Sequence, residues 1–124
     1  LWFGNEYAPG EINLVYGTAQ VLHYLKEAGI KDTLVTGAEQ WLIQGQNSDG
    51  SWGAVGSIEE TAVAVAALQG HACTARGIDW LTQHTRHGTH FPASPIGLYF
   101  ARLWYHERLY PIVWTLGTRP SSEA

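Results

Sequence analysis

The sequence predicts an all-α fold built from stacked helical hairpins. Apolar residues recur at helical spacing in several segments, and no segment alternates as a strand would. The pair Trp41-Leu42 also returns about 40 residues later as Trp80-Leu81, a period typical of helix pairs that bury their faces on neighbouring pairs. About two and a half such units cannot close on themselves, so we expect uncovered apolar faces at the ends of the stack.

The composition indicates a packed domain and excludes several classes of protein. With 45% apolar and 15% charged residues, the 124-residue chain does not have the composition of a disordered protein. Its net charge of −4 argues against a nucleic-acid partner, which would require a basic face. The sequence shows no signal peptide, and no apolar run reaches the ~18 residues of a membrane-spanning helix. The chain lacks methionine and begins with Leu1, so we expect a processed product or part of a longer protein.

Three regions are predicted along the chain. Residues 1–15 hold glycine, proline and scattered aromatic residues, and should form an ordered loop. Residues 16–117 should form the helical-hairpin repeats, and residues 118–124 a frayed tail. The first helix is predicted from Tyr16, where apolar residues begin to recur at threefold spacing, to the stop signal at Gly29.

The second helix should begin near Asp32 or Thr33 and fade at residues 45–46. The segment that follows it, residues 47–53, has the sequence Asn-Ser-Asp-Gly-Ser-Trp-Gly. Such a concentration of Asn, Asp, Ser and Gly is a strong turn signal, because these residues bond to nearby backbone or tolerate left-handed conformations.

The third helix carries the clearest start signal. Ser57 and Glu60 have the spacing of a capping box, in which each side chain bonds to the backbone N–H of the other residue. Residues 61–68 are apolar nearly all round, so this helix should be buried on most sides before it ends at Gly70. The pair Glu59-Glu60 is also a candidate acid, but the capping box and the helix dipole already account for both carboxylates.

A fourth helix is predicted from about Cys73 to His84, and an aromatic helical segment from Pro95 to about Leu116. Proline inside a helix removes a hydrogen bond and clashes with the preceding turn. We therefore expect a break or kink just before Pro111.

The histidines invite a metal site, but the pattern is incomplete. His84, His87 and His90 are evenly spaced, yet Gly88 interrupts the segment and no neighbouring carboxylate or cysteine completes a ligand set. A solvated polar loop is the simpler interpretation, so no metal and no cofactor are expected. The single cysteine, Cys73, excludes an intrachain disulfide and has no local activating partner, and should be a small buried residue.

The first helix-to-turn junction has Trp41, then Gln46, Gly50 and Trp52, and Trp80 begins a second copy of the pattern. This spacing resembles the QW motif of the terpene cyclases, in which a Gln and a Trp recur at the end of each outer helix. A Gln side chain offers two donors and an acceptor, so it can stack on an indole and tie the turn to the helix end. The alternative is a helix that simply ends at a turn.

Three further segments resemble the squalene–hopene cyclases. Residues 2–4, Trp-Phe-Gly, resemble the tail of a preceding QW repeat, and residues 16–18, Tyr-Gly-Thr, match the start of an inner helix. Residues 95–105 resemble the C-terminal aromatic segment, with Tyr110-Pro111 in the place of a final Phe-Pro. The resemblance implies an incomplete α/α toroid, part of an α6–α6 barrel, from the C-terminal end of such a protein.

The resemblance also implies a chemistry. The family protonates a terminal alkene of squalene and stabilises the resulting carbocations with aromatic faces. Its acid lies in an Asp-x-Asp-Asp motif, which this sequence lacks, so we expect the chain alone to be inactive. Tyr16 matches a tyrosine that helps to reprotonate the acid; the alternative is an aromatic residue packed at a helix start.

Five further residues are candidates for the substrate cavity by the same resemblance. Tyr99 and Tyr105 match cavity aromatics, with ordinary core packing as the alternative. Leu98 and Arg102 stand where the family places cavity aromatics, and Tyr7 stands near a cavity Trp within a longer loop. A cation at Arg102 would repel a carbocation, so either this side chain faces away or the product differs.

Departures from the family pattern leave a second class of function open. Thr85 stands where the second QW repeat should have Gln, and His90 where it should have Trp. A non-catalytic lipid- or protein-binding toroid, related to prenyltransferase β subunits, is therefore the alternative. For a cyclase, the expected partners are squalene or a similar polyprenoid and the remainder of the toroid, in the cytoplasm, with peripheral membrane contact and a homodimer as open alternatives.

Overall fold

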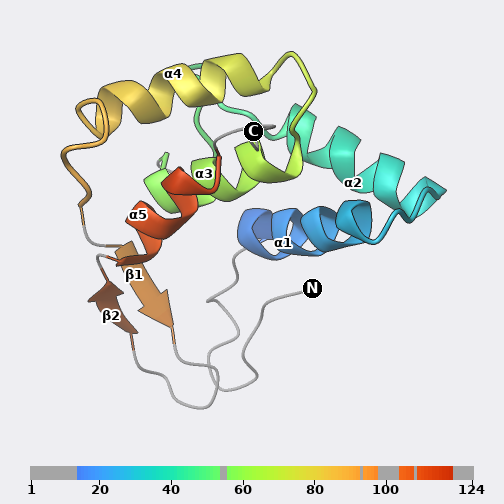
Figure 1. The fold of residues 1–124 in the computed structure, drawn as a ribbon, viewed down its shortest axis with the longest axis horizontal. Helices are drawn as coiled ribbons and strands as arrows, with labels where there is room; N and C mark the ends of the chain where they lie inside the picture. The colour runs from blue at the N-terminus through green and yellow to red at the C-terminus, as the bar shows by residue number, and fades with distance from the viewer. Residues whose placement is uncertain (1–13, 54–55, 93, 98–103, 108, 119–124) are drawn as a thin grey trace, which may run out of the picture.

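A computed structural model describes residues 14–53, 56–92, 94–97, 104–107 and 109–118. Strand residues 94–97 and 104–107, and helix residues 109–110, are described by their backbone alone. The elements within these residues are α1 (Leu14–Glu27), α2 (Thr33–Gln44), α3 (Ile58–Ala67), α4 (Thr74–His84), β1 (Ser94–Gly97), β2 (Trp104–Glu107) and α5 (Leu109–Leu116) (Figure 1).

The helices form two layers of hairpins. Helices α1, α3 and α5 pack side by side as an inner row, with α3 in contact with both of its neighbours. Helix α2 packs on α1, and α4 packs on α3, so each consecutive pair contributes one helix to each layer (Figure 1). The prediction of stacked helical hairpins is therefore confirmed.

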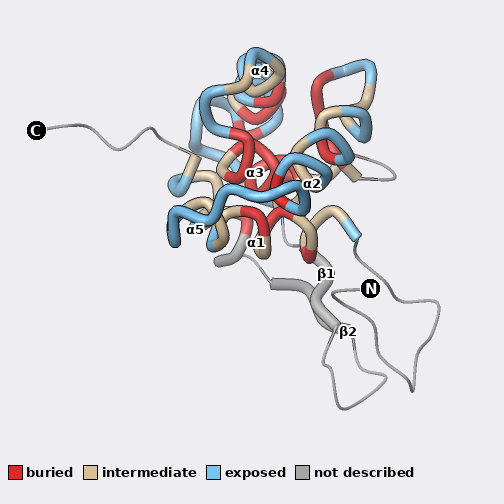
Figure 2. The backbone as a smooth tube through the Cα atoms, turned by 90° about the vertical axis from the view of Figure 1, so that its right-hand side faces the viewer, coloured by how far each residue is buried: buried red, intermediate tan, exposed pale blue. Residues whose placement is uncertain are grey.

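Helix α3 forms the centre of the core. Seven of its ten residues are buried, and red marks its length among the paler helices in Figure 2. Alternating Ala and Val side chains keep α3 narrow, which allows α1, α4 and α5 to approach it from three sides. The prediction that this segment is buried nearly all round is confirmed, because an apolar face on each side needs a neighbour on each side.

Local capping signals set the helix ends. Helix α1 ends in a Schellman motif: the Ile30 N–H donates to the Leu25 carbonyl, and the N–H of Gly29, at φ +73°, donates to Lys26. The Ser57 hydroxyl accepts from the Glu60 N–H at 3.0 Å and starts α3 as predicted. The Ser57 N–H donates to the Trp52 carbonyl at 3.1 Å, which ties the start of α3 to the preceding turn.

The all-helical prediction is wrong for the start of the C-terminal aromatic segment. Strands β1 and β2 form an antiparallel pair, in which Ser94 lies opposite Glu107 and Gly97 opposite Trp104. Proline and glycine in β1 disfavour a helix, and the aromatic residues of β2 suit a strand. The predicted break before Pro111 is confirmed: α5 begins at Leu109, so Pro111 lies in its first turn, where its missing N–H costs no helix hydrogen bond.

Candidate functional site

The turn between α2 and α3, residues 46–53, is held by its own polar side chains; we call it the first QW turn. The Asn47 N–H donates to the Ser51 carbonyl at 2.8 Å, and the Asn47 side-chain amide donates to the Ser51 hydroxyl and to the Gly53 carbonyl. The Asp49 carboxylate accepts from the backbone N–H and the hydroxyl of Ser51 at 2.9 and 2.7 Å. These bonds hold the turn through contacts within its own residues.

Two side chains of the first QW turn connect it to the surrounding helices. The Gln46 side-chain Nε2 donates to the Gly50 carbonyl within the turn and to the Cys73 carbonyl at the start of α4, both at 3.0 Å. The Trp52 indole is fully buried, and its Nε1 donates to the Leu42 carbonyl at 2.7 Å, near the end of α2. The Trp52 backbone N–H donates to the Thr61 hydroxyl of α3. The turn therefore joins α2, α3 and α4.

Close contact with α4 requires glycine at two positions. Gly50 has φ +98°, and a Cβ there would lie 2.6 Å from the Arg76 carbonyl oxygen. A Cβ on Gly77 would lie 2.6 Å from a Val65 methyl and 3.0 Å from the Trp52 ring. The Arg76 guanidinium adds hydrogen bonds to the carbonyls of Ser48 and Asn47. Helix α4 thus lies directly against the turn.

Trp80 is the second anchor between α4 and the turn. Its indole is 6% exposed, and its Nε1 donates to the Asp49 carboxylate at 3.1 Å. The His84 ring stacks on this indole, with centroids 3.9 Å apart. Hydrogen bonds from the Ser51 hydroxyl and N–H and from Trp80, together with the charge of His84, outweigh a smaller effect of burial and hold the pKa of Asp49 below its ordinary value.

The second turn, residues 85–90, is built differently. The Thr85 side chain is 2% exposed; its hydroxyl donates to the Leu81 carbonyl at 2.7 Å and accepts from the Gly88 N–H at 3.1 Å. The His90 backbone N–H donates to the Thr85 carbonyl, and the His90 side chain is exposed. The bonds described for Thr85 therefore remain within its own helix end and turn.

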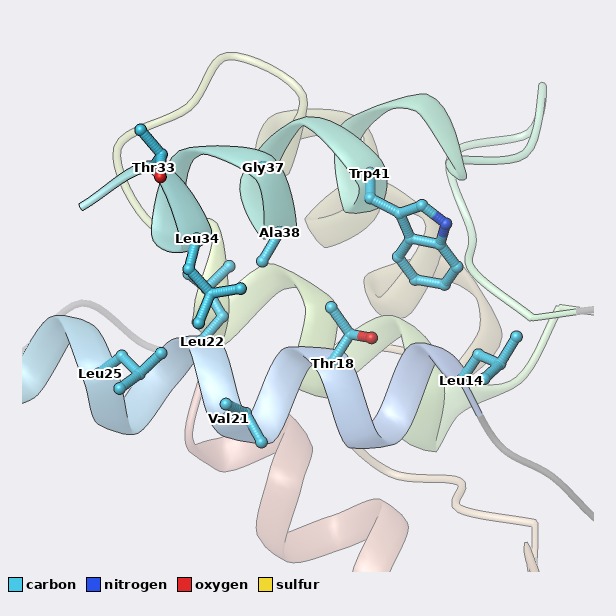
Figure 3. Close-up of a pocket in the computed structure, with 10 residues that line it drawn as sticks. All are labelled: Leu14, Thr18, Val21, Leu22, Leu25, Thr33, Leu34, Gly37, Ala38 and Trp41. Atoms are coloured by element: carbon cyan, nitrogen blue, oxygen red, sulfur yellow. The ribbon is translucent and has the colours of Figure 1, made fainter. Parts of the chain in front are cut away.

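Trp41 holds the position of Trp80 one repeat earlier but lies in a different environment. Its indole is 43% exposed. It lies at one end of an apolar groove between α1 and α2, near Leu14 at the start of α1 (Figure 3). The same sequence signal thus gives one buried and one exposed tryptophan.

Tyr16 lies on α1 in the inner row. Its half-buried ring packs against Trp114 of α5, with centroids 4.9 Å apart and ring planes inclined at 53°. Trp114 carried no motif in the sequence, and only the apolar run after Pro111 could have indicated it. The pair brings together residues from the two ends of the described chain.

Glu59 and Glu60 lie in the first turn of α3, as the capping interpretation requires. A Cβ on Gly53 would lie only 1.6 Å from a Glu60 carboxylate oxygen, so this carboxylate occupies the space that a side chain at Gly53 would need. Gly53 has φ +100°, a conformation that also favours glycine.

Most of the predicted cavity residues lie outside the described part of the chain. These are Tyr7, Leu98, Tyr99 and Arg102. Tyr105 is described by its backbone alone and pairs with Ile96 across the β-hairpin. The strand pairing fixes the register of Tyr105, and the surroundings of its side chain lie outside the described structure.

An ionic cluster that the sequence did not reveal joins α1, α2 and the loop before α4. The Glu39 carboxylate lies 3.2 Å from Lys26 Nζ and 3.5 Å from His71 Nε2, and Lys26 also donates to the Ala67 carbonyl. Burial opposes ionisation of Glu39, but the hydrogen bonds and charges of Lys26 and His71 hold its pKa below the ordinary value. Its members are far apart in sequence, so no local pattern marks them.

Among the described residues, no three or more His, Cys, Asp or Glu side chains are placed to hold a metal ion. Burial raises the pKa of the Cys73 thiol, which disfavours a nucleophilic thiolate. No helix among them has both the length and the apolar character needed to cross a bilayer.

Two layers of α/α hairpins, with an outer helix that ends in a Gln- and Trp-bonded turn, define an α/α-hairpin repeat protein. A comparison with known families gives the particular one: residues 1–67 match the squalene-hopene cyclase C-terminal domain. The chain belongs to this family.

A curated relative agrees with the family assignment. The chain is 32% identical over 100 residues to a squalene–hopene cyclase of Bradyrhizobium diazoefficiens, in a match that covers 63% of the chain and 15% of the relative. The chain therefore spans a small part of the length of that relative. No solved structure matches the chain significantly.

Proposed function

We propose that the chain is the C-terminal part of a triterpene cyclase that converts squalene, or a similar polyprenoid, into a polycyclic product. Family membership over residues 1–67 carries this proposal. The reaction needs an acid strong enough to protonate an alkene, a dry cavity and aromatic faces that stabilise carbocations. The family's acid motif does not occur in the sequence, so the acid comes from another part of the protein and this part supplies cavity wall.

The first QW turn supports the proposed role because it holds the helices of the proposed cavity wall in place. Cation cascades need a cavity whose shape and dryness persist through the reaction. Gln46 and Trp52 bond the ends of three helices to one turn, which limits how far the hairpins can slide. We assign this bracing role to Trp41, Gln46, Gly50, Trp52 and Trp80.

Tyr16 is the residue to which we assign a chemical role, in reprotonation of the acid. It belongs to the inner row of helices and packs on Trp114, which restricts the orientation of its ring. Tyr99, Tyr105, Leu98, Arg102 and Tyr7 are assigned to the cavity lining.

The test is cyclisation of squalene by the longer protein that carries this chain, with products identified by mass spectrometry. A polycyclic product is expected, and none from the 124-residue chain alone. Tyr16→Phe in the longer protein should lower kcat by about 10- to 100-fold, the worth of one hydrogen bond to a charged group. Tyr24→Phe is the matched control, because Tyr24 lies on the same helix and is 64% exposed.

The local bonding of Thr85 favours a second candidate, a toroid that binds a polyprenoid without converting it. Retention of squalene by the longer protein with no polycyclic product would favour this candidate over the cyclase.

A further inference from the structure

Helix α5 makes a contact that holds the side chain of Tyr16 from outside the α1–α2 hairpin. The Trp114 ring of α5 and the Tyr16 ring have centroids 4.9 Å apart and planes inclined at 53°. Helix α3 contacts both α1 and α5, so this ring pair joins the two helices that flank it (Figure 1). Tilted aromatic pairs at this separation attract one another beyond the burial of their surfaces. The orientation of Tyr16 therefore depends on a helix that lies far along the chain.

The face of α5 that meets Tyr16 begins at Pro111. Pro111 is fully buried in the first turn of the helix, and Trp114 follows it three positions later, so the two lie on one face. Trp114 packs against the hydrophobic core on that face. Val113 and Leu116, on other faces, are 55% and 52% exposed. The register of α5 thus directs Trp114 toward the inner row of helices.

Tyr16 lies where its own helix restrains it least. It belongs to the first turn of α1, where backbone N–H groups have no acceptor within the helix. Leu14, two residues earlier, is 44% exposed, and the Tyr16 side chain is half-buried. The hydroxyl is the atom of the side chain farthest from the backbone, so it moves most when the ring turns. A contact on the ring therefore sets where the hydroxyl lies.

We propose that Trp114 is a positioning residue, which holds the Tyr16 ring in the orientation that its hydroxyl needs to reprotonate the acid. This role rests on the proposed function for the task of Tyr16 and on the ring contact for the part of Trp114. Trp114 acts through Tyr16 alone and exchanges no proton. Displacement of a reacting group by about 1 Å can cost ~100-fold in rate, so loss of the contact should be visible in kcat. The loss cannot exceed that caused by removal of the Tyr16 hydroxyl.

A double-mutant cycle in the longer protein, read by squalene cyclisation, tests this role. Trp114→Ala should lower kcat by about 10-fold, within the range expected for Tyr16→Phe, with little change in KM. Trp114→Phe should restore most of the rate, because it keeps an aromatic ring beside Tyr16. In the Tyr16→Phe background, Trp114→Ala should cause no further loss, since the hydroxyl that it positions is gone.

The matched control is Val113→Ala, at an exposed position of the same helix, which should leave kcat unchanged. If Trp114→Ala does not fold, Trp114→Leu takes its place, because it removes the aromatic ring and keeps apolar volume. An unchanged kcat in the Trp114 variant would overturn the inference. An equal loss in the wild-type and Tyr16→Phe backgrounds would also overturn it, since that is the result of a purely structural role.

NMR of the Tyr16 ring in the 124-residue chain tests the contact without the reaction. The Trp114 indole should shift the ring protons of Tyr16, and Trp114→Leu should abolish that shift while Val113→Ala preserves it. Absence of the shift in the unsubstituted chain would overturn the inference whatever the activity. Absence of product from the longer protein, with the shift present, contradicts the proposed function alone. Product whose rate does not respond to Trp114→Ala contradicts this inference alone.

Discussion

The first QW turn and the second turn occupy the same place in consecutive hairpins, yet within the described residues only the first shows side-chain hydrogen bonds to several helices. Gln46 reaches from the turn to the Cys73 carbonyl before α4, and Trp52 reaches back to Leu42 of α2. Thr85, in the place of Gln46, bonds within one turn of its own position. The difference is one of side-chain length and donor number: a Gln amide has two donors on a flexible arm, and a Thr hydroxyl has one on a short, branched stem.

The largest difference between the two turns should appear on truncation of their aromatic positions. Trp52→Ala should destabilise the chain by about 3–5 kcal/mol, because it leaves a cavity beside α3 and removes the indole donor to the Leu42 carbonyl. His90→Ala, at the corresponding position of the second turn, should change stability by less than about 0.5 kcal/mol, since that side chain is exposed. Urea unfolding measures both. Equal losses would show that the turns are equivalent after all.

Glycine substitutions should show that Gly50 of the first turn lies directly against α4, whereas Gly88 of the second turn faces open space. Gly50→Ala should cost about 2–5 kcal/mol, because backbone strain at φ +98° adds to the clash with the Arg76 carbonyl. Gly88→Ala has similar strain at φ +85° but open space around it, and should cost about 1–2 kcal/mol. Thermal unfolding of the two variants isolates the contribution of the clash. A Gly88 variant as unstable as the Gly50 variant would contradict the close contact.

Removal of the Gln46 amide should have a smaller effect. Gln46→Met keeps the length of the side chain and loses the bonds to Gly50 and Cys73, so we expect a loss of about 1–3 kcal/mol. Gln83→Met, on the exposed surface of α4, is the control and should be close to neutral. Hydrogen exchange at the start of α4 should also increase in the Gln46 variant. Unchanged exchange there would argue against the bond to Cys73 as the tie between the turn and α4.

The smallest expected effect is a decrease in the free energy of unfolding at low pH that arises from the first turn. The folded-state pKa of Asp49 is lowered, so its contribution to stability is present above the ordinary Asp value of 3.8 and is lost as pH falls through the folded-state pKa. Asp49→Asn should weaken the dependence of the unfolding free energy on pH below that value. Asp79→Asn, at an exposed position of α4, is the comparison. A pH dependence that is the same in both variants would show that Asp49 does not cause the loss of stability in acid.

The signals that could be found in the sequence were those that act within a few residues. The Ser57 cap, the Gly29 stop and the turn residues 47–53 each act on backbone groups close by, and α1 to α4 lie where they predicted. The β-hairpin was missed because strand pairing joins Ser94 to Glu107 across a connection that periodicity does not register. The cluster of Lys26, Glu39 and His71 and the contact of Tyr16 with Trp114 were also not predicted, because their members are far apart in the sequence.

By itself, the sequence determined the helices, their hairpin repeat and the family to which the chain belongs. The tertiary structure alone decided which of two equivalent tryptophans is buried: Trp80 lies against the first QW turn, and Trp41 faces an open groove. It also decided that the Ser57 N–H bonds to the Trp52 carbonyl of the preceding turn. The physical reason is the same in both cases. A helix end depends on donors and acceptors within one turn of backbone, whereas the burial of an indole depends on which distant segment packs against it.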